Sequence, residues 1–199
     1  MIWQDYIPPA IRDLYEIHDF RHAAAILSTE LSNELRDLLD ALGKFRITTK
    51  DILDPGGNES RIPKLVSEIL RPLGWEEGQL HAEMKVDGIV RSTDTHKVDY
   101  LKGRVAFDLE WNSKDQTFDR DLFAFRTFHE LEKISVGILL TRSSSLNPVF
   151  EKLGVKTKYG ASTTWMGKLL PRIQAGRGGG CPILVFGITP KLISDWVGE

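Results

Sequence analysis

The feature of this sequence that most constrains its fold is the nearly continuous apolar run ISVGILL at residues 134–140. Strands that are apolar at successive positions are typical of the middle of a sheet that is covered on both faces. Upstream, residues 105–111 alternate like a strand, and residues 118–131 place apolar side chains at helical spacing. A strand, a helix and a strand within about 35 residues predict a right-handed βαβ crossover with parallel strands. We therefore predict an α/β fold.

The remaining elements surround this unit. Pro8-Pro9 opens a predicted helix whose apolar and aromatic positions are Ile11, Leu14, Tyr15 and His18. A second predicted helix, at about residues 21–42, carries one apolar stripe made of Ala24, Leu27, Leu31, Leu35, Leu38 and Leu42. A third helix is expected at residues 60–71. Residues 80–90 and 182–187 predict strands, residues 91–94 a turn and residues 54–58 a loop.

The length of 199 residues predicts one domain. We divide it into a helical N-terminal part (about residues 8–72), a sheet core (80–142) and a basic C-terminal part (143–199). The net charge is −2, yet residues 142–180 hold seven basic side chains and one acid, so that segment is +6 and the remainder −8. This asymmetry favours a polyanion bound on one face, although an ordinary solvated surface fits it equally well.

Several classes of protein are excluded. The single cysteine, Cys181, excludes an internal disulfide framework and a multi-cysteine zinc site. The histidines show no zinc-ligand spacing, and the glycine-rich residues 176–180 lack the Lys-Ser/Thr of a P-loop, so we expect no nucleotide cofactor. No apolar run approaches the roughly 20 residues that span a bilayer, and no signal-peptide pattern opens the chain. We expect a cytoplasmic protein that does not enter a membrane.

Two carboxylates form the sharpest candidate for a functional site. Asp108 and Glu110 are two positions apart on a predicted strand, so their side chains share a face with Cα atoms roughly 7 Å apart. A divalent cation such as Mg²⁺ relieves the repulsion between such groups. Asp99, nine residues earlier, lies where an adjoining strand could return to the same point. On spacing alone, a solvated strand at a half-exposed sheet is the simpler interpretation.

The surrounding sequence adds a family resemblance. It is carried by HKVDY at 96–100, VAFDLEWNSKDQTFDRDL at 105–122, ISVGILLTR at 134–142, YGASTT at 159–164 and GCPILVFG at 180–187. From about residue 56 onward, the chain resembles the BstYI/BglII family of type II restriction endonucleases, and within it BstYI most closely. The resemblance implies a PD-(D/E)xK core with a central mixed sheet flanked by helices, acting as a symmetric homodimer.

The resemblance also implies an activity. The substrate would be duplex DNA at a short palindrome containing GATC, of the purine-GATC-pyrimidine type, with both strands cut to leave 5′-phosphate ends. Mg²⁺ would be the cofactor, with Mn²⁺ as a substitute. Asp99 matches the first metal-binding acid of the family. Asp108 matches the second, where relatives more often have Glu, and the backbone carbonyl of Leu109 would be a further ligand.

Two further acids follow from the resemblance. Glu110 stands where the wider superfamily has a lysine, so it is expected to orient or deprotonate the attacking water, or to help hold a second metal. Family members often add a polar or acidic residue from an upstream helix. Glu77 is the best match to it, and Glu76 is the alternative.

Three polar segments resemble the DNA-contacting parts of the family. They contribute the candidate DNA-binding residues Asn112, Ser113, Lys114, Arg142, Ser143, Ser144, Ser162, Thr163 and Thr164. Side chains of these types read base edges in the major groove, and each subunit of a dimer reads one half of a palindrome. A turn or a helix cap is the competing role for each Ser and Thr.

Two other functions remain open. One is a nuclease of the same fold that acts in repair or recombination and recognises DNA structure rather than sequence. The other is a DNA-binding protein whose acids no longer hold metal, which the unusual Asp108 would favour.

Overall fold

The computed structural model describes residues 2–54, 60–94 and 96–197, so most of the loop predicted at residues 54–58 lies outside the described residues. The helices are α1 (Pro9–Arg12), α2 (Ala23–Glu30), α3 (Ser32–Lys44), α4 (Thr49–Leu53), α5 (Arg61–Leu70), α6 (Thr117–Glu130), α7 (Asn147–Lys152) and α8 (Met166–Gln174). The strands are β1 (Tyr15–Phe20), β2 (Glu76–Gly78), β3 (His81–Val86), β4 (Ile89–Asp94), β5 (Val98–Lys102), β6 (Val105–Glu110), β7 (Val136–Arg142) and β8 (Ile183–Ile188). None of the helices in these ranges is long and apolar enough to cross a membrane.

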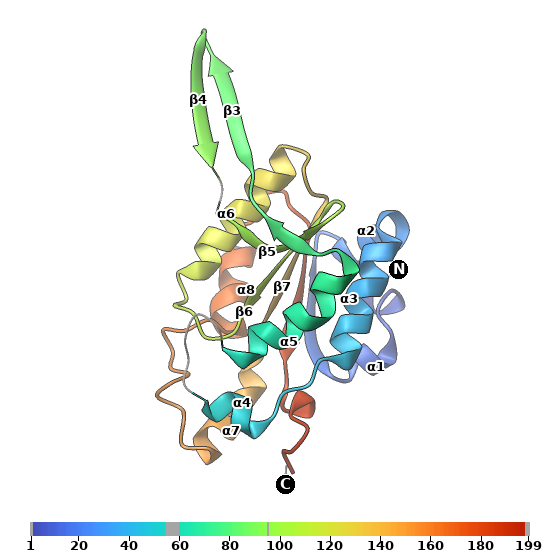
Figure 1. The fold of residues 1–199 in the computed structure, drawn as a ribbon, viewed down its shortest axis with the longest axis vertical. Helices are drawn as coiled ribbons and strands as arrows, with labels where there is room; N and C mark the ends of the chain where they lie inside the picture. Colours follow the sequence, from blue (N-terminus) through green and yellow to red (C-terminus); the bar gives the residue numbers. More distant parts are fainter. Residues whose placement is uncertain (1, 55–59, 95, 198–199) are drawn as a thin grey trace.

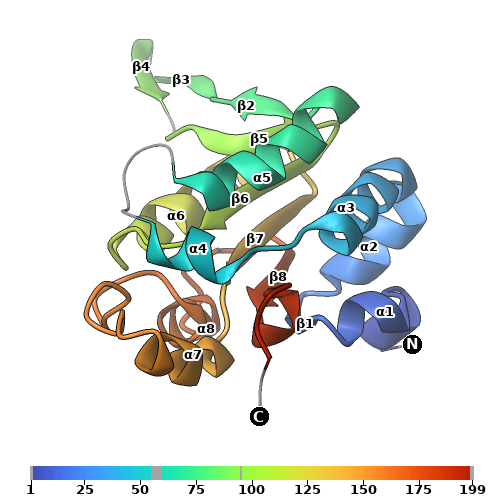
Figure 2. The same ribbon diagram turned by 60° about the horizontal axis from the view of Figure 1, so that its bottom comes forward.

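Six strands form one mixed sheet in the order β1-β8-β7-β6-β5-β2, which Figure 2 shows from one edge to the other. The central pairs β6–β7 and β7–β8 are parallel, and the outer pairs β1–β8, β5–β6 and β2–β5 are antiparallel. The predicted α/β class and the central mixed sheet flanked by helices are therefore confirmed. The third predicted helix (α5) and the late strand (β8) are also present.

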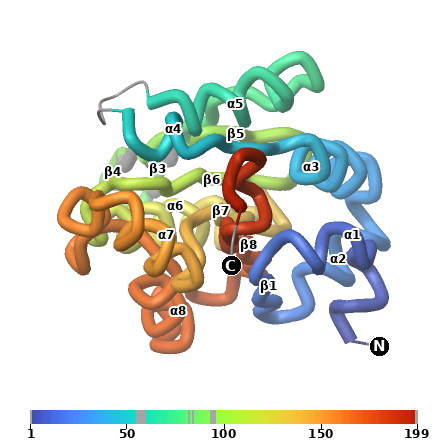
Figure 3. Tube along the Cα trace, turned by 90° about the horizontal axis from the view of Figure 1, so that it is seen from below, coloured from blue at the N-terminus to red at the C-terminus, as the bar shows by residue number. Residues whose placement is uncertain are grey.

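The β6-α6-β7 unit is the predicted crossover, and every residue of β6 and β7 is buried. Each face of these strands packs into its own apolar cluster. Val105, Phe107 and Leu109 join a cluster with α3 and α5, whereas Ala106 and Leu139 join one with α6 and α8. Figure 3 shows α5 on one side of the strands and α8 on the other. Burial on both faces explains why β7 is apolar from Val136 to Leu140.

The N-terminal helix prediction is wrong beyond Arg12. Tyr15 and His18, placed on a helix by their spacing, lie on β1, which pairs with β8 from Tyr15–Ile188 to Phe20–Ile183. Local spacing of the apolar residues fits a helix, but hydrogen bonds to the edge of the sheet outweigh that weak local preference. The strand begins shortly after the one-turn helix α1 ends.

The single helix predicted at residues 21–42 is two helices. Leu31 leaves the helical conformation, with φ −131° and ψ 42°, and separates α2 from α3. The break lies among Thr29, Ser32 and Asn33, which have low helix propensity. The predicted apolar stripe is nevertheless buried along both helices.

The turn predicted at residues 91–94 is also wrong, because these residues belong to β4. The chain turns instead at Asp87 and Gly88, whose φ values of 49° and 83° suit the two central positions of a type I′ hairpin. The resulting β3–β4 hairpin forms a separate two-stranded sheet that projects from the body of the molecule (Figure 1). Its polar residues 91 and 92 therefore face solvent rather than marking a turn.

The close packing of α6 on β7 generates a test. A Cβ added at Gly137 would lie 2.3 Å from Cδ2 of Phe125. We expect Gly137→Ala to lower the free energy of unfolding by about 1–3 kcal/mol, because a buried ring must shift. The measurement is thermal unfolding followed by circular dichroism.

The matched control is Gly43→Ala in α3, where the new Cβ meets Ile11 at an ordinary 3.7 Å. That substitution should stabilise the protein by up to about 1 kcal/mol through helix propensity. Equal effects of the two substitutions would contradict the packing described for Gly137.

Candidate active site

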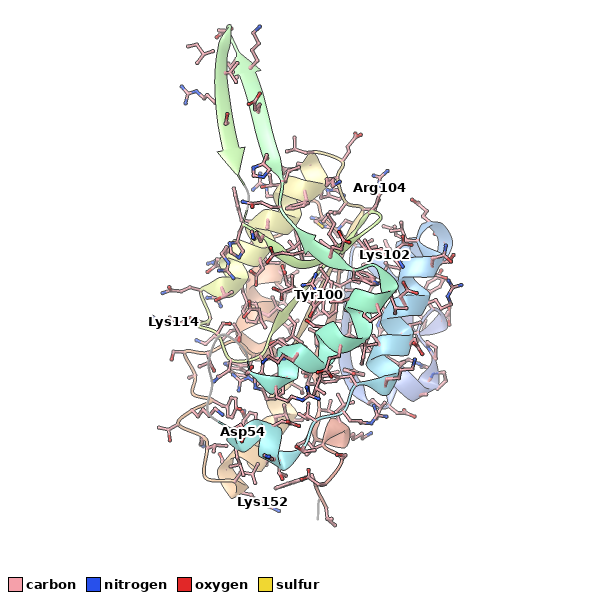
Figure 4. The ribbon with its side chains drawn as sticks, in the orientation of Figure 1. Asp54, Tyr100, Lys102, Arg104, Lys114 and Lys152 are labelled. Atoms are coloured by element: carbon pink, nitrogen blue, oxygen red, sulfur yellow. The ribbon has the colours of Figure 1, made fainter. Side chains whose placement is uncertain are left out.

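The site lies at the open end of the β5–β6 hairpin, away from its turn. Antiparallel pairing runs from Lys102–Val105 to Tyr100–Phe107, and Figure 4 labels Tyr100 within this sheet. Beyond the Tyr100–Phe107 pair, the two strands are joined by hydrogen bonds from backbone N–H groups to side-chain carboxylates. The backbone N–H of Asp99 donates to Oδ1 of Asp108 (2.7 Å), and the N–H of Leu109 donates to Oδ2 of Asp99 (3.0 Å). The two acids are thus held together by main-chain donors of the opposite strand.

Asp108 and Glu110 point toward α6 from alternate positions of β6, and their exposed fractions are 4% and 6%. Burial, followed by repulsion from Asp99 and Glu110, raises the pKa of Asp108 well above its usual range. Burial also raises the pKa of Glu110 to about 7. Each carboxyl group has one buried oxygen without a hydrogen-bond partner among the described residues, Oδ2 of Asp108 and Oε2 of Glu110.

Asp99 lies at the rim of this cluster. The residue as a whole is exposed, but desolvation of its carboxyl group still raises its pKa, while the Leu109 N–H and Arg120 act in the opposite direction. The structure therefore brings together Asp99, Asp108 and Glu110 from two neighbouring strands. Asp99 is the member of this group that is open to an incoming ligand.

A fourth acid, Asp121, was missed by the sequence reasoning. It lies on α6, is 2% exposed, and its Oδ2 has no partner among the described residues. Burial, followed by the charges of Asp108 and Glu110, raises the pKa of Asp121 to about 10. A signal was present, because helical spacing places Asp121 on the same face as the core residues Phe118 and Phe125. An acid on a core-facing stripe is costly unless it serves a site.

Arg120 faces the buried part of this cluster. Its Nη2 lies 3.4 Å from Oδ1 of Asp121 and 3.9 Å from Oε1 of Glu110. Its side chain is half exposed, so it offsets the buried negative charge only in part. Arg71 is a second cation near Asp99, to whose carbonyl oxygen it donates at 3.0 Å. Four acids therefore outnumber two arginines, and retained protons or further cations would offset the remaining charge.

The donors present suit a hard divalent cation. Among the described residues, no three His, Cys, Asp or Glu side chains are grouped so that they form a complete metal site by themselves. Mg²⁺ does not require such a group, because it is usually held by one or two carboxylates together with water and substrate phosphate. The unpartnered buried oxygens of Asp108, Glu110 and Asp121 are of the right chemical type. The residues present therefore fit Mg²⁺.

Glu77 stands outside the buried cluster. It lies on β2 rather than on the expected upstream helix, and its half-exposed carboxylate pairs with Nζ of Lys97 at 2.6 Å. That hydrogen bond holds the pKa of Glu77 below its usual range. Its charge contributes to the raised pKa of Asp99, so Glu77 is near the rim of the site. Glu76, the alternative, is exposed on the same short strand.

Two of the three predicted DNA-contacting segments lie side by side. The N–H of Asp115 donates to the carbonyl of Ser162 (3.0 Å), and Lys114 and Thr163 form an isolated antiparallel bridge. Ser113, Lys114 and Ser162 are exposed, whereas Asn112 and Thr163 are half-buried. Figure 4 shows Lys114 at the outside of the molecule, in the loop that follows β6.

Three of the predicted DNA-contacting side chains are buried. The exposed fractions of Arg142, Ser143 and Thr164 are 1%, 5% and 0%. The Ser143 hydroxyl donates to Oε2 of Glu16 (2.5 Å), whereas the neighbouring Ser144 is exposed. The predicted DNA contacts of these three residues would require their side chains to become exposed. Helical and strand periodicity could not reveal this, because burial depends on loops that are distant in sequence.

The basic C-terminal segment is less free than its composition suggested. Arg172 and Arg177 both pair with Asp119, Lys168 and Arg172 lie near Asp115, and Lys156 pairs with Glu151. The two aspartates come from the polar residues just before and within α6. The segment therefore packs its charge against the acidic part of the chain rather than presenting all of it to solvent.

A protein-family model described as "Restriction endonuclease BglII/BglIII" matches residues 15–188, which include every strand of the six-stranded sheet. The sequence matches no curated protein.

The crowded carboxyl groups predict an unusual pH dependence of stability. The pKa values of Glu110 and Asp121 are raised to about 7 and about 10 in the folded protein. The folded state therefore retains protons that the unfolded state has released, and stability falls as pH rises from 5 to 8. Each retained proton costs about 1.4 kcal/mol per pH unit, so we expect metal-free protein in EDTA to lose on the order of 4–6 kcal/mol across this range.

The measurement is the thermal midpoint at each pH, with Asp121→Asn as the comparison variant. Removing the ionisable group should flatten the pH profile and raise the midpoint at pH 8. Mg²⁺ should stabilise the native protein more at pH 8 than at pH 6, because cation and protons compete for the same oxygens. An identical pH profile for Asp121→Asn would contradict the placement of Asp121 in this cluster.

Proposed function

Because the chain belongs to the BglII/BglIII restriction endonuclease family, we propose that it is a Mg²⁺-dependent enzyme that hydrolyses both strands of duplex DNA at a short palindrome containing GATC. The proposed site is of the purine-GATC-pyrimidine type, the products carry 5′-phosphates, and Mn²⁺ substitutes for Mg²⁺. The working form is a cytoplasmic homodimer that uses no nucleotide cofactor. The observation that carries the proposal is the cluster of buried carboxyl groups at the end of β5 and β6, with oxygens that lack partners.

Asp99, Asp108 and the backbone carbonyl of Leu109 are the residues that would hold Mg²⁺. When bound, the ion would neutralise phosphate charge and lower the pKa of a water molecule. The hydrogen bonds between β5 and β6 keep Asp99 and Asp108 in register before any ligand arrives. Because the protein itself forms no covalent bond to the substrate, this positioning before the ligand binds would contribute much of the rate enhancement.

Glu110 is the residue that we assign to the attacking water. Its carboxylate would orient the water and accept a proton as the water oxygen bonds to phosphorus. The bond between phosphorus and the 3′ oxygen breaks in line, and the leaving 3′ oxygen takes a proton from solvent. The products are a 5′-phosphate and a 3′-hydroxyl. Thr141 supports this position, because its hydroxyl donates to the Glu110 carbonyl (2.7 Å) and ties the end of β6 to β7.

Recognition is assigned to the exposed polar side chains near the end of β6. Ser113, Lys114 and Ser162 are exposed. The first two lie in the loop that follows Glu110, and Ser162 is hydrogen-bonded to that loop. A contact between this loop and a base would directly affect the position of Glu110, which orients the attacking water. In a two-fold dimer, each copy would read one half of the palindrome.

The direct experiment is digestion of long natural duplex DNA by purified protein in Mg²⁺ and in EDTA, followed by sequencing of the fragment ends. We expect discrete fragments in Mg²⁺ alone, with ends that share one palindrome containing GATC. Ends without a common sequence would favour a repair or recombination nuclease. Specific binding with no cleavage in either Mg²⁺ or Mn²⁺ would favour a DNA-binding protein without activity.

The role of Asp99 is tested by Asp99→Ala. The loss of a cation ligand should reduce cleavage by about a thousandfold or more, since several kcal/mol of charge stabilisation disappear. Specific DNA binding, measured by fluorescence anisotropy in Mg²⁺, should remain. The matched control is Asp40→Ala, which removes an exposed pair with Lys44 on α3 and should leave cleavage unchanged. Undiminished cutting by Asp99→Ala would remove Asp99 from the site.

A further inference from the structure

Arg142 is a buried cation that the proposed chemistry does not use. It ends β7, and its exposed fraction is 1%. In the ranges that the structure describes, it forms no ion pair with a carboxylate, and burial lowers its pKa to about 10. Removing a guanidinium from water without a carboxylate partner is costly, so the surroundings must compensate by other means.

The first compensation is aromatic. The guanidinium carbon lies 4.9 Å from the ring centre of Tyr159, 5.5 Å from that of Phe150 and 5.9 Å from that of Trp111. The rings of Phe150 and Tyr159 stack on one another, and Trp111 meets both edge-on. Cation–π attraction is strongest at such desolvated positions. The rings come from three different parts of the chain, so the cation holds these parts against one another.

The second compensation is a set of hydrogen bonds to one short segment. Nε and Nη2 of Arg142 donate to the carbonyl oxygen of Thr164, at 3.0 Å and 2.7 Å. Nη2 also donates to Oγ1 of Thr163 at 2.5 Å. The planar fork of the guanidinium suits these acceptors, and an ammonium group would not reproduce the arrangement.

The same segment is bound to the loop after β6. The Thr164 N–H donates to the Ser113 carbonyl (2.9 Å), and the Ser113 N–H donates to Oγ1 of Thr164 (3.2 Å). Arg142 thus fixes Thr163 and Thr164. Their segment in turn holds the loop at residues 112–115, which begins two residues after Glu110. Trp111 carries the aromatic contact into this loop as well.

We propose that Arg142 is a positioning residue for sequence discrimination, which sets the placement of the two loops at residues 112–115 and 162–164 without itself touching DNA. The inference rests on the proposed function for its consequence, because those loops matter for specificity only if they read DNA. Loosening them should admit near-cognate sites more than it slows cleavage of the correct one. The carboxyl groups that would hold Mg²⁺, Asp108 on β6 and its neighbour Asp99 on β5, lie on the face of the sheet opposite Arg142. We therefore expect metal binding to be independent of Arg142.

The first test uses the free protein and needs no activity. Amide hydrogen exchange is measured for Ser113, Asp115 and Thr164 in the native chain, in Arg142→Lys and in Arg142→Met. We expect exchange at these amides to accelerate at least tenfold in both variants, while the amide of Leu139 in β7 keeps its native protection. Unchanged exchange, or equal acceleration at Leu139, would overturn the bracing role.

A second variant covers the case in which Arg142 substitutions fail to fold. Thr163→Val removes the hydroxyl that accepts from Arg142, so the same three amides should exchange faster by a smaller factor. Arg36→Met, at an exposed position of α3, is the matched control and should change none of them. Native exchange rates in Thr163→Val would count against the proposal.

The second test compares kcat/KM on the palindromic site found by digestion with kcat/KM on sites that differ at one outer base pair. In Arg142→Lys this ratio should fall at least tenfold, with a smaller fall in kcat on the correct site. A proportional loss on all sites would overturn the assignment to specificity. If the native protein cuts no DNA, the proposed function fails, and the exchange measurement alone still decides whether Arg142 braces the loops.

Discussion

Asp108, Glu110 and Asp121 place three carboxyl groups within a water-poor layer between β6 and α6, with a fourth, Asp99, at its rim. Like charges in such surroundings are costly, so the pKa values of these carboxyl groups are raised. Backbone N–H donors stabilise Asp99 and Asp108, and Arg120 offsets part of the charge. Without a ligand, the repulsion between these carboxyl groups is relieved when some of them hold protons. A bound divalent cation would relieve the same repulsion when the protons are lost.

The rest of the fold supplies the rigidity that this cluster requires. β7 and β8 are buried along their whole length, and two separate apolar clusters cover the two faces of the sheet. The β6-α6-β7 crossover has a direct chemical consequence, because it brings Asp121 of α6 over the face of β6 that carries Asp108 and Glu110. An acid from the crossover helix therefore joins acids from the strands through topology alone.

The two faces at the end of β6 carry opposite charges. Glu110 faces α6 and the acidic cluster, whereas the next residue, Trp111, faces the other side and contacts Arg142. Alternation of side chains along the chain separates the acids from the buried arginine by the thickness of the sheet. The loop at residues 112–115 therefore continues directly from the strand that carries Asp108 and Glu110, and Arg142 stabilises its position through Trp111 and Thr164. This connection gives a physical route by which recognition and cleavage can be coupled.

Local periodicity was enough to determine the βαβ unit at residues 105–142, the helix α5, and the common face of Asp108 and Glu110, because strand and helix repeats fix which side chains share a face. The sequence also contains the Asp87-Gly88 pair, which is typical of a hairpin turn, and an acid, Asp121, on a core-facing helical stripe. Pairing with β8 made a strand of residues 15–20, and long-range packing buried Arg142 and Thr164. Those outcomes were decided by tertiary structure alone, since a residue's partners across the sheet and its exposure to water depend on segments far away in the sequence.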